Sequence, residues 1–231
     1  MQAIIGGTSL LGSRIFSGWS DKKVKTPFGT VAVKAKGKTV FLQRHGNPPL
    51  PPHRIDHRAN IAALKKLGVE KILAVNSVGS LKAAIKPGSL AIPGDFICPW
   101  HIPTFHDDDM RFLIPSMDEG LARKVFKICK EHTKTVRMGA VYVQTLGPRL
   151  ETKAEINMLR RFGDIIGMTL ASEATLAIEQ GIPYASICSV DNYCNGIAKV
   201  PLTMDKIYEN VSKNEKTIED ILDHFITKGL P

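Results

Sequence analysis

The stretch that decides the fold is residues 139–169, GAVYVQTLGPRLETKAEINMLRRFGDIIGMT. Residues 140–143 predict a strand, which the Gly147-Pro148 pair ends. A helix is expected from Glu151 to about Arg161, and a second apolar run then ends in Met168-Thr169. Strand, helix and apolar run in this order indicate an α/β sheet.

Both polar segments of this stretch are expected at one edge of the sheet. In open α/β sheets, ligands bind beyond the carboxyl ends of the strands, where loops and helix N-termini present polar groups. Arg149, Leu150 and Glu151 follow the first strand, and Met168-Thr169 ends the apolar run. The stretch therefore predicts a small-molecule pocket at this edge.

The rest of the chain continues the alternation of strands and helices. Residues 31–34 and 39–43 predict a hairpin about Gly37, so the sheet is expected to be mixed. Further strands are predicted at 3–5, 72–75 and 184–190, and at 90–92 and 96–97 on either side of a Pro-Gly turn. Helices are predicted from an Asp56 cap to Leu67, over 121–131, from a Ser172 cap to Gln180, and over 204–225. No repeat or linker interrupts the pattern, which predicts one domain over residues 1–231.

Composition favours an enzyme with a small anionic substrate. Hydrophobic residues make up 43% and charged residues 23% of the 231 positions, as in globular rather than disordered or fibrous chains. The net charge of +9 would also suit nucleic acid or an acidic membrane. However, Lys and Arg are scattered, and two Trp and four Tyr offer little stacking surface. We therefore expect no nucleic-acid partner.

The cysteines and the start of the chain indicate the compartment. Cys98, Cys129, Cys188 and Cys194 are widely spaced with no Cys-x-x-Cys pair, which favours free thiols. The chain opens on a predicted strand rather than a signal peptide, and no apolar run is long enough to span a bilayer. A cytoplasmic protein with no membrane partner is expected.

Polar side chains follow four predicted strands. They are Thr8-Ser9, Arg44-His45, Asn76-Ser77 and Met168-Thr169. A phosphate group requires backbone N–H groups, hydroxyl donors and a guanidinium, and Thr8, Arg44, Ser77 and Thr169 supply them if the four ends converge. Each residue alone is an ordinary turn or surface residue, so the prediction depends on the repetition.

Three other sites were weighed against these residues. The segment 6–12, GGTSLLG, has the outer glycines of a P-loop, but Ser13 replaces its Lys. It also resembles the dinucleotide turn of short-chain dehydrogenases, where Ser9 replaces the middle glycine and no acidic residue closes the second strand. A metal site in the 100–109 loop has candidate ligands but no supporting His-x-x-x-His or Glu-x-x-His helix. These candidates are His101, His106, Asp107, Asp108 and Asp109. No metal and no cofactor are expected.

Seven motifs in order resemble the 5′-methylthioadenosine phosphorylase branch of the trimeric purine nucleoside phosphorylases. They are GGTSL at 6–10, RHG at 44–46, PPHRIxxRAN at 51–60, VGSL at 78–81, GPR at 147–149, GMT at 167–169 and EAxLAxExGIxYASI at 173–187. The match runs from residue 4 to about residue 193 and is weaker from Cys194 onward.

The resemblance implies a fold, a reaction and a set of site residues. The fold is a three-layer α/β sandwich with a central mixed sheet, and the reaction is attack of phosphate on the anomeric carbon of a purine nucleoside. The implied phosphate-binding residues are Thr8, Arg44, His45, Asn76, Ser77 and Thr169. Met168 is implied under the ribose, and Leu150, Glu151, Asn192, Tyr193 and Cys194 at the base. A homotrimer or a dimer of trimers is also implied.

Departures from the family pattern indicate the base. Adenine-specific members have a small hydroxyl residue where this chain has Glu151, and aspartates where it has Asn192 and Cys194. A carboxylate only accepts hydrogen bonds, so Glu151 suits the N1–H of a 6-oxopurine, and the Asn192 carboxamide can donate to O6 and accept from N7–H. Inosine, guanosine or 5′-methylthioinosine is therefore the expected substrate. Two alternatives are an adenine-specific methylthioadenosine phosphorylase, and a Glu151 that only caps the following helix.

The expected chemistry involves three catalytic residues. Arg44 and His45 hold the phosphate that stabilises and then captures a cationic ribose, and Asn192 stabilises charge on the departing purine. Met204 is the tentative specificity residue for the 5′ group, with Leu202 and Tyr208 beside it; Tyr208 also fits a plain core residue.

Overall fold

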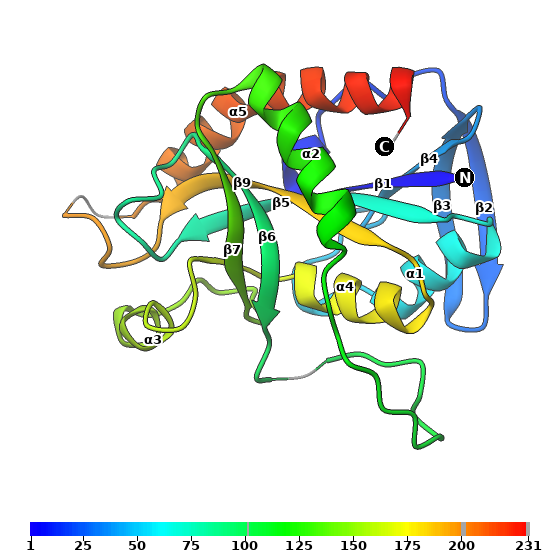
Figure 1. The fold of residues 1–231 in the computed structure, drawn as a ribbon, viewed down its shortest axis with the longest axis horizontal. Coiled ribbons are helices and arrows are strands. Elements are labelled where there is room, and N and C mark those ends of the chain that lie inside the picture. The colour runs from blue at the N-terminus through cyan, green and yellow to red at the C-terminus, as the bar shows by residue number, and fades with distance from the viewer. Residues whose placement is uncertain (101, 200–201, 230–231) are drawn as a thin grey trace.

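The computed structural model describes residues 1–100, 102–199 and 202–229 (Figure 1). The strands are β1 (Gln2–Gly6), β2 (Ser20–Thr26), β3 (Gly29–Lys36), β4 (Thr39–Gln43), β5 (Lys71–Ser80), β6 (Leu90–Ile97), β7 (Val136–Gln144), β8 (Ile165–Gly167) and β9 (Tyr184–Tyr193). The helices are α1 (His57–Lys66), α2 (Glu119–His132), α3 (Lys153–Leu159), α4 (Leu170–Glu179) and α5 (Met204–Lys228), with two 3-10 turns, η1 (Thr8–Leu10) and η2 (Pro52–Arg54). No helix of the described residues is long and apolar enough to cross a membrane.

The strands form one mixed sheet in the order β2-β3-β4-β1-β5-β8-β7-β6-β9. β1 is parallel to β4 and β5, and β5 is parallel to β9, so the carboxyl ends of these four strands meet at one edge. The predicted hairpin is present as the antiparallel pair of β3 and β4. β5 pairs with both β8 and β9, which closes β5, β8, β7, β6 and β9 into a ring.

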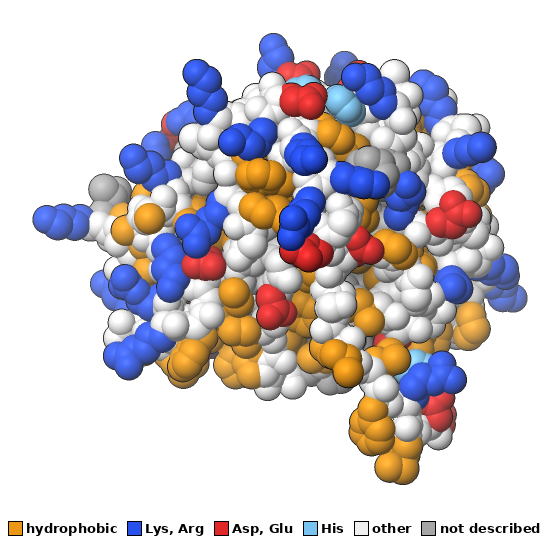
Figure 2. Space-filling view, in the orientation of Figure 1, with side chains coloured by type: hydrophobic (Ala, Val, Ile, Leu, Met, Phe, Trp, Pro, Cys, Tyr) orange, Lys and Arg blue, Asp and Glu red, His pale blue; other side chains and the backbone are white. Residues whose placement is uncertain are grey.

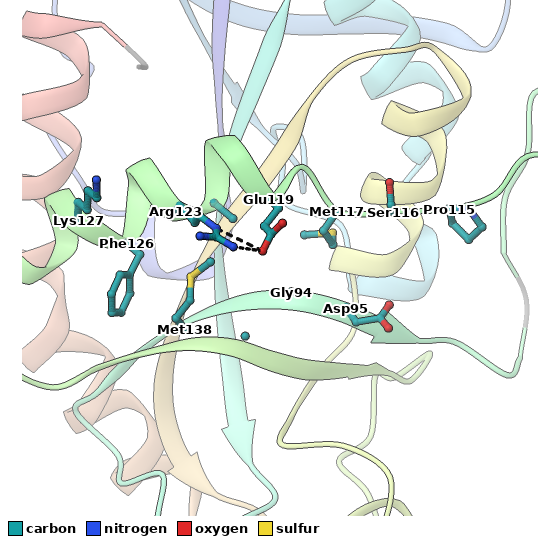
Figure 3. Close-up of a pocket in the computed structure, with 12 residues that line it drawn as sticks. Gly94, Asp95, Pro115, Ser116, Met117, Glu119, Arg123, Phe126, Lys127 and Met138 are labelled. Carbon is teal, nitrogen blue, oxygen red and sulfur yellow. Dashed lines mark hydrogen bonds and ion pairs between the residues drawn. The ribbon is translucent and has the colours of Figure 1, made fainter.

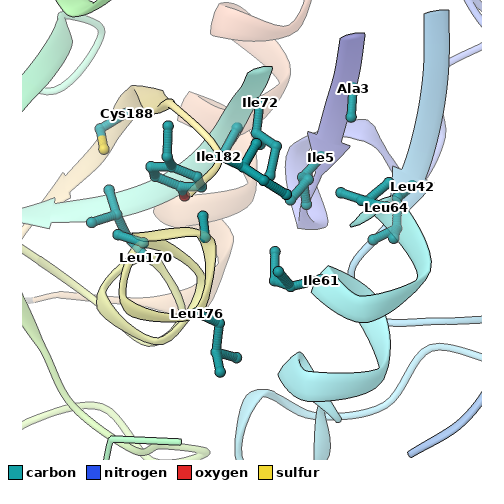
Figure 4. Close-up of a cluster of buried hydrophobic side chains, with 14 of the residues drawn as sticks. Ala3, Ile5, Leu42, Ile61, Leu64, Ile72, Leu170, Leu176, Ile182 and Cys188 are labelled. Carbon is teal, nitrogen blue, oxygen red and sulfur yellow. The ribbon is translucent and has the colours of Figure 1, made fainter. Parts of the chain in front are cut away.

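Helices cover both faces of the sheet. Figure 4 shows Ile61 of α1 and Leu170 of α4 packed with strand residues such as Ile5 on one face. On the other face α2 and α5 contribute Val125 and Phe225 to a second buried cluster (Figure 1). Each such side chain contributes about 1.5–3 kcal/mol by leaving water. The predicted three-layer α/β fold with a mixed sheet is confirmed.

The two predicted helix caps have different outcomes. Asp56 caps α1 as predicted, and its Oδ1 accepts from the Ala59 N–H at 2.8 Å. Ser172 does not begin a helix, because α4 starts at Leu170 with Thr169 as its N-cap residue. The Ser172 hydroxyl instead accepts from the Gln144 amide at 2.6 Å inside the protein.

Other boundaries also differ from the sequence predictions. Asn76 and Ser77 lie within β5 rather than after it, because the strand continues through small residues to Ser80. Residues 90–97 form the single strand β6, whose register shifts around Pro93, rather than two strands about a turn. β2 was not predicted, because its sequence SDKKVKT has a charged face and only Val24 is buried.

Residues 98–100 and 102–118, here called the arm, lie between β6 and α2 in the sequence and outside the three layers. Figures 1 and 2 show the arm projecting from the body, with hydrophobic side chains at its end. Met110, Phe112 and Ile114 are 87%, 85% and 93% exposed. On the face shown in Figure 2, Lys and Arg are spread widely and do not gather in one patch.

Candidate active site

A cavity of about 550 Å³ lies at the edge where the parallel strands end. Of the residues predicted for the site, eleven line it: Thr8, Arg44, His45, Ser77, Leu150, Glu151, Met168, Thr169, Asn192, Cys194 and Met204. They come from η1, the β4–α1 loop, β5, the β7–α3 loop, the β8–α4 junction, the end of β9, and α5. Segments far apart in the sequence therefore converge as predicted.

Arg44 supplies the guanidinium of the cavity, but three of its five N–H donors are already used. Its Nε and Nη2 donate to Glu173 at 2.6 and 3.2 Å, and its Nη1 donates to the Val75 carbonyl at 2.7 Å. Tyr184 also donates to Glu173, at 2.9 Å. Burial would lower the pKa of Arg44, but the charge and hydrogen bonds of Glu173 raise it above its usual value. Gly7 allows this packing, since a Cβ there would lie 2.2 Å from Nη1.

His45 lines the same end of the cavity as a neutral ring. Its Nδ1 lies 2.8 Å from the Leu50 carbonyl, and because a carbonyl only accepts, Nδ1 carries the proton. Burial lowers the pKa of His45, opposed by the Leu50 bond and assisted by the Arg44 charge. Nε2 is therefore the nitrogen available to a ligand, as an acceptor at neutral pH.

The hydroxyl group of Thr169 is oriented by a buried amide side chain. The Asn76 amide donates to Thr169 Oγ1 at 2.9 Å while its carbonyl accepts from Ser186 at 2.7 Å. Asn76 therefore orients Thr169 from behind and does not line the cavity. The N–H groups of Thr169 and Leu170 both point to the Tyr142 hydroxyl, at 3.3 and 3.4 Å.

The hydroxyl of Ser77 is bonded to an acid that the sequence analysis did not select. Ser77 donates to Asp191 Oδ2, and Ser189 donates to Asp191 Oδ1 at 2.5 Å. Asn214 of α5 donates to Ser189 at 2.8 Å, and Asn210 donates to the Asp191 carbonyl at 2.8 Å. Asp191 has no exposed surface; burial raises its pKa to about 6, against hydrogen bonds from Ser189, Ser77 and Asn214 that lower it.

Glu151 and Asn192 also line the cavity. Thr145 donates to Glu151 Oε1 at 2.6 Å, which leaves Oε2 free to accept. Glu151 does not cap α3, because Thr152 is the N-cap and forms a capping box with Glu155. Asn192 Nδ2 donates to the Tyr193 carbonyl at 3.0 Å, which leaves its second N–H and its carbonyl oxygen. Burial, and then the Glu151 charge, raises the pKa of Cys194, whose thiol stays neutral.

The apolar part of the cavity lining comes mainly from α5. Met204, Leu202 and Tyr208 line it together with Ile207 and Val211. Tyr208 is 63% exposed, so the prediction that it is a plain core residue is wrong. Met168 forms the floor, and Gly147 allows the 147–151 loop to pass over it, since a Cβ there would lie 2.5 Å from the Met168 sulfur.

Two residues predicted near the pocket point elsewhere. The Tyr193 hydroxyl donates to the Ala83 carbonyl at 3.1 Å and does not line the cavity. Along β9 successive side chains alternate between faces, so Asn192 faces the cavity and Tyr193 faces away. Arg149 donates to Glu155 at 2.7 and 2.8 Å and lies outside the cavity lining.

A larger hollow of about 720 Å³ lies between α2 and the strands β6 and β7 (Figure 3). Figure 3 shows Arg123 paired with Glu119, beside Phe126 and Met138. None of the residues selected from the sequence lines it. Of its four charged side chains, Arg123 and Glu119 pair with each other.

The other candidate sites of the sequence analysis were examined in the structure. The glycine turn at 6–12 leads into the three-residue η1 rather than into the helix that a dinucleotide site needs. In the arm, His106 lies 3.0 Å from Asp109, while Asp107 pairs with Arg58 at 2.6 Å; His101 lies outside the described residues. Among the described residues, no three His, Cys, Asp or Glu side chains gather as a metal site would require.

Sequence reasoning did not select Glu173 or Asp191. Both acids are at most 1% exposed. Asp191 directly follows the apolar run of β9, and Glu173 lies four residues after Thr169 on α4. An acid within an otherwise buried segment was the available signal, because a buried carboxylate needs partners.

Comparison with known proteins defines the family. The phosphorylase superfamily profile matches residues 3–227, and the chain belongs to this superfamily. It is 38% identical to the probable 6-oxopurine nucleoside phosphorylase of Archaeoglobus fulgidus, over 99% of this chain and 96% of that one. It is 40% identical to the probable S-methyl-5′-thioinosine phosphorylase of Methanocaldococcus jannaschii, over 99% and 93%.

A solved structure of a related enzyme has the same fold as this chain. A methylthioadenosine phosphorylase from Schistosoma mansoni in complex with adenine superposes with a TM-score of 0.84 at 26% identity, covering 96% of this chain and 89% of that one. The family resemblance predicted from the motifs is confirmed.

Proposed function

We propose that this protein catalyses phosphorolysis of 6-oxopurine nucleosides. The substrates are inosine, guanosine or 5′-methylthioinosine, and the products are the free base and ribose 1-phosphate or 5-methylthioribose 1-phosphate. The observation that carries the proposal is one cavity lined by both groups of residues. We assign Arg44, Ser77 and Thr169 to the anion, here called the anion end, and Glu151 and Asn192 to the base, here called the base end. The names of the two archaeal relatives support this reaction class.

At the anion end, phosphate is the co-substrate and nucleophile. Arg44 keeps one N–H on each terminal nitrogen for it, and Thr169 and Thr8 supply hydroxyl groups. As the sugar–base bond lengthens, positive charge on the ribose is stabilised by the adjacent phosphate, which then captures the anomeric carbon. The reaction needs no covalent enzyme intermediate, and we propose no further cofactor.

At the base end, the hydrogen-bonding pattern selects an oxygen at C6. Glu151 Oε2 accepts from N1–H, and the Asn192 amide donates to O6 while its carbonyl accepts from N7–H as charge reaches the purine. An adenine ring offers an acceptor at N1 and would leave Glu151 facing a lone pair in a half-buried site. Unpaired buried groups make such sites strongly discriminating.

The alternative is an adenine-specific methylthioadenosine phosphorylase. The Schistosoma mansoni neighbour in complex with adenine keeps this alternative open. The residues at the base end favour the 6-oxopurine. Glu151 and Asn192 both depart from the pattern of adenine-specific members, and both departures suit the hydrogen bonding of a 6-oxopurine.

The test is base release from inosine, guanosine, methylthioinosine and methylthioadenosine, with and without phosphate. We expect release that depends strictly on phosphate and favours the three 6-oxopurines by about a hundredfold or more in kcat/KM. The double variant Glu151→Ser with Asn192→Asp should shift the ratio of kcat/KM toward methylthioadenosine. Arg149→Ala, in the same loop as Glu151 but outside the cavity lining, is the matched control. Phosphate-independent release, or an unchanged ratio in the double variant, would contradict the proposal.

We also propose that the protein forms a homotrimer or a dimer of trimers. The arm supports an assembly, because Met110, Phe112 and Ile114 expose large apolar side chains together, as interaction surfaces do. The family resemblance supplies the number of subunits.

A further inference from the structure

The two hydroxyl groups at the anion end have opposite hydrogen-bonding roles. Thr169 Oγ1 accepts from the Asn76 amide, so its own proton is free to donate into the cavity. Ser77 lines the cavity and gives its proton to Asp191, so its hydroxyl oxygen has only lone pairs left to offer a ligand. A bound anion therefore meets a donor at Thr169 and an acceptor at Ser77.

The direction of the Ser77 bond follows from the groups behind it. Asn214 has an N–H pointing at Ser189, so Ser189 uses its proton on Asp191 Oδ1. Asp191 Oδ2 accepts from Ser77. When Asp191 is ionised, Ser77 must donate to it; when Asp191 is protonated at Oδ2, it donates to Ser77 and releases the Ser77 proton toward the cavity.

An acceptor at an anion site discriminates between anions by their protons. Phosphate near neutral pH carries at least one P–OH, which can donate to Ser77. Sulfate has the same shape and no proton, so its oxygen would face the Ser77 lone pairs, with the buried Asp191 charge directly behind. A buried acceptor left facing another acceptor is strongly unfavourable.

We propose that the Ser77–Asp191 pair recognises the proton of phosphate and excludes fully deprotonated oxyanions such as sulfate. This inference rests on the proposed function and adds a selectivity element to it. Asp191 acts through Ser77 and is a positioning residue. Holding the P–OH at Ser77 also keeps the proton off the oxygens that face the sugar, so the attacking oxygen is an unprotonated one.

Among the neighbouring titratable groups, His45 offers a second acceptor, Nε2, which Asp191→Asn leaves unchanged. Around Asp191, β5 presents Ser77 and α5 presents Asn210 and Asn214, all of which are neutral. Burial raises the pKa of the adjacent Cys188 to about 12, so it stays a thiol. Arg44 is paired with Glu173. His45, whose pKa is lowered by burial, is the other group that gains a proton as the pH falls.

The experiment compares phosphate with sulfate at about pH 8, where Asp191 and His45 are both deprotonated. In steady-state assays with inosine, we measure KM for phosphate and the competitive inhibition constant of sulfate. The wild-type enzyme should bind sulfate about a hundredfold or more weakly than phosphate. Asp191→Asn should reduce this ratio at least about tenfold, because an amide N–H can donate to Ser77 and free its proton for sulfate.

Two controls distinguish a loss of selectivity between phosphate and sulfate from a general loss of anion binding. Thr8→Val removes another cavity hydroxyl and should weaken both anions with the ratio unchanged. The pH arm needs no variant: sulfate inhibition of the wild type should strengthen between about pH 8 and pH 6 as Asp191 gains its proton. His45 contributes equally in Asp191→Asn, so the additional change in the wild type belongs to Asp191.

Three results would overturn the inference: similar affinities for both anions in the wild type, an unchanged ratio in Asp191→Asn, or equal pH slopes in the two proteins. Titration calorimetry of phosphate and sulfate on the protein without nucleoside repeats the comparison without turnover. Selective phosphate binding without phosphorolysis contradicts the proposed function alone. Phosphorolysis without selectivity contradicts this inference alone.

Discussion

At the scale of single residues, Asp191 keeps a carboxylate inside the protein with only neutral partners. Its folded pKa of about 6 lies above its ordinary value of 3.8, so the folded protein binds this proton more tightly than the unfolded chain. The free energy of unfolding therefore falls as the pH rises from about 4 to about 6, and stays lower above that window.

The Asp191→Asn variant should accordingly be more stable than the wild type at neutral pH. We expect a gain of about 2 kcal/mol in the free energy of unfolding near pH 7.5, because the uncharged amide avoids the cost of burying a charge. The gain should disappear near pH 4, where wild-type Asp191 is protonated. Urea unfolding at both pH values measures it, with Asp220→Asn as the control at an exposed position of α5. A wild type that is the more stable protein at pH 7.5 would contradict this account.

Residues that line the cavity were easier to predict than the buried residues that hold them in place. Glu151 and Asn192 were selected because base chemistry constrains the cavity wall, and the structure places both on it. Asn76 was expected on the wall but lies behind Thr169, and Glu173 and Asp191 were not selected. A sequence shows which side chains can bind an anion, but not which hydroxyl donates to which buried acid.

At the scale of elements, α5 connects the anion end to the apolar side of the cavity. Asn210 and Asn214, one helical turn apart, bond to the end of β9, and Met204 and Tyr208 of the same helix line the cavity. The apolar spacing of α5 predicted a helix, whereas the sequence did not predict β2 and predicted β6 as two strands. Charged or proline-containing strands lack the alternation that identifies a strand.

Met204 should determine the response to the 5′ group. Met204→Ser should lower kcat/KM for methylthioinosine about tenfold, because apolar contact with the methylthio group is lost, and should change inosine less than about threefold. Met158→Ser is a matched control, since Met158 is 47% exposed against 49% for Met204 but lies on α3 outside the cavity. Equal effects of Met204→Ser on both nucleosides would show that the 5′ group lies elsewhere.

At the scale of the whole molecule, the arm is the feature that a single chain leaves unexplained. Phe112→Glu with Ile114→Lys should shift the protein from an oligomer to a monomer in sedimentation velocity, because charges cannot be buried at the contact without cost. Phe162→Glu, on a side chain that is 65% exposed outside the arm, should leave the oligomer intact. A monomeric wild type, or an unchanged double variant, would contradict the proposed assembly.

The ring formed by β5, β8, β7, β6 and β9 has a consequence for solubility. The ring leaves no free edge in that part of the sheet, so β2 is the one open edge strand among the described strands. The unpaired backbone N–H and C=O groups of an edge strand can pair with another chain, which leads to aggregation unless charged side chains prevent it. Lys22, Lys23 and Lys25 lie along β2 on its exposed positions. Part of the positive charge of the protein therefore guards the open edge of the sheet against self-association.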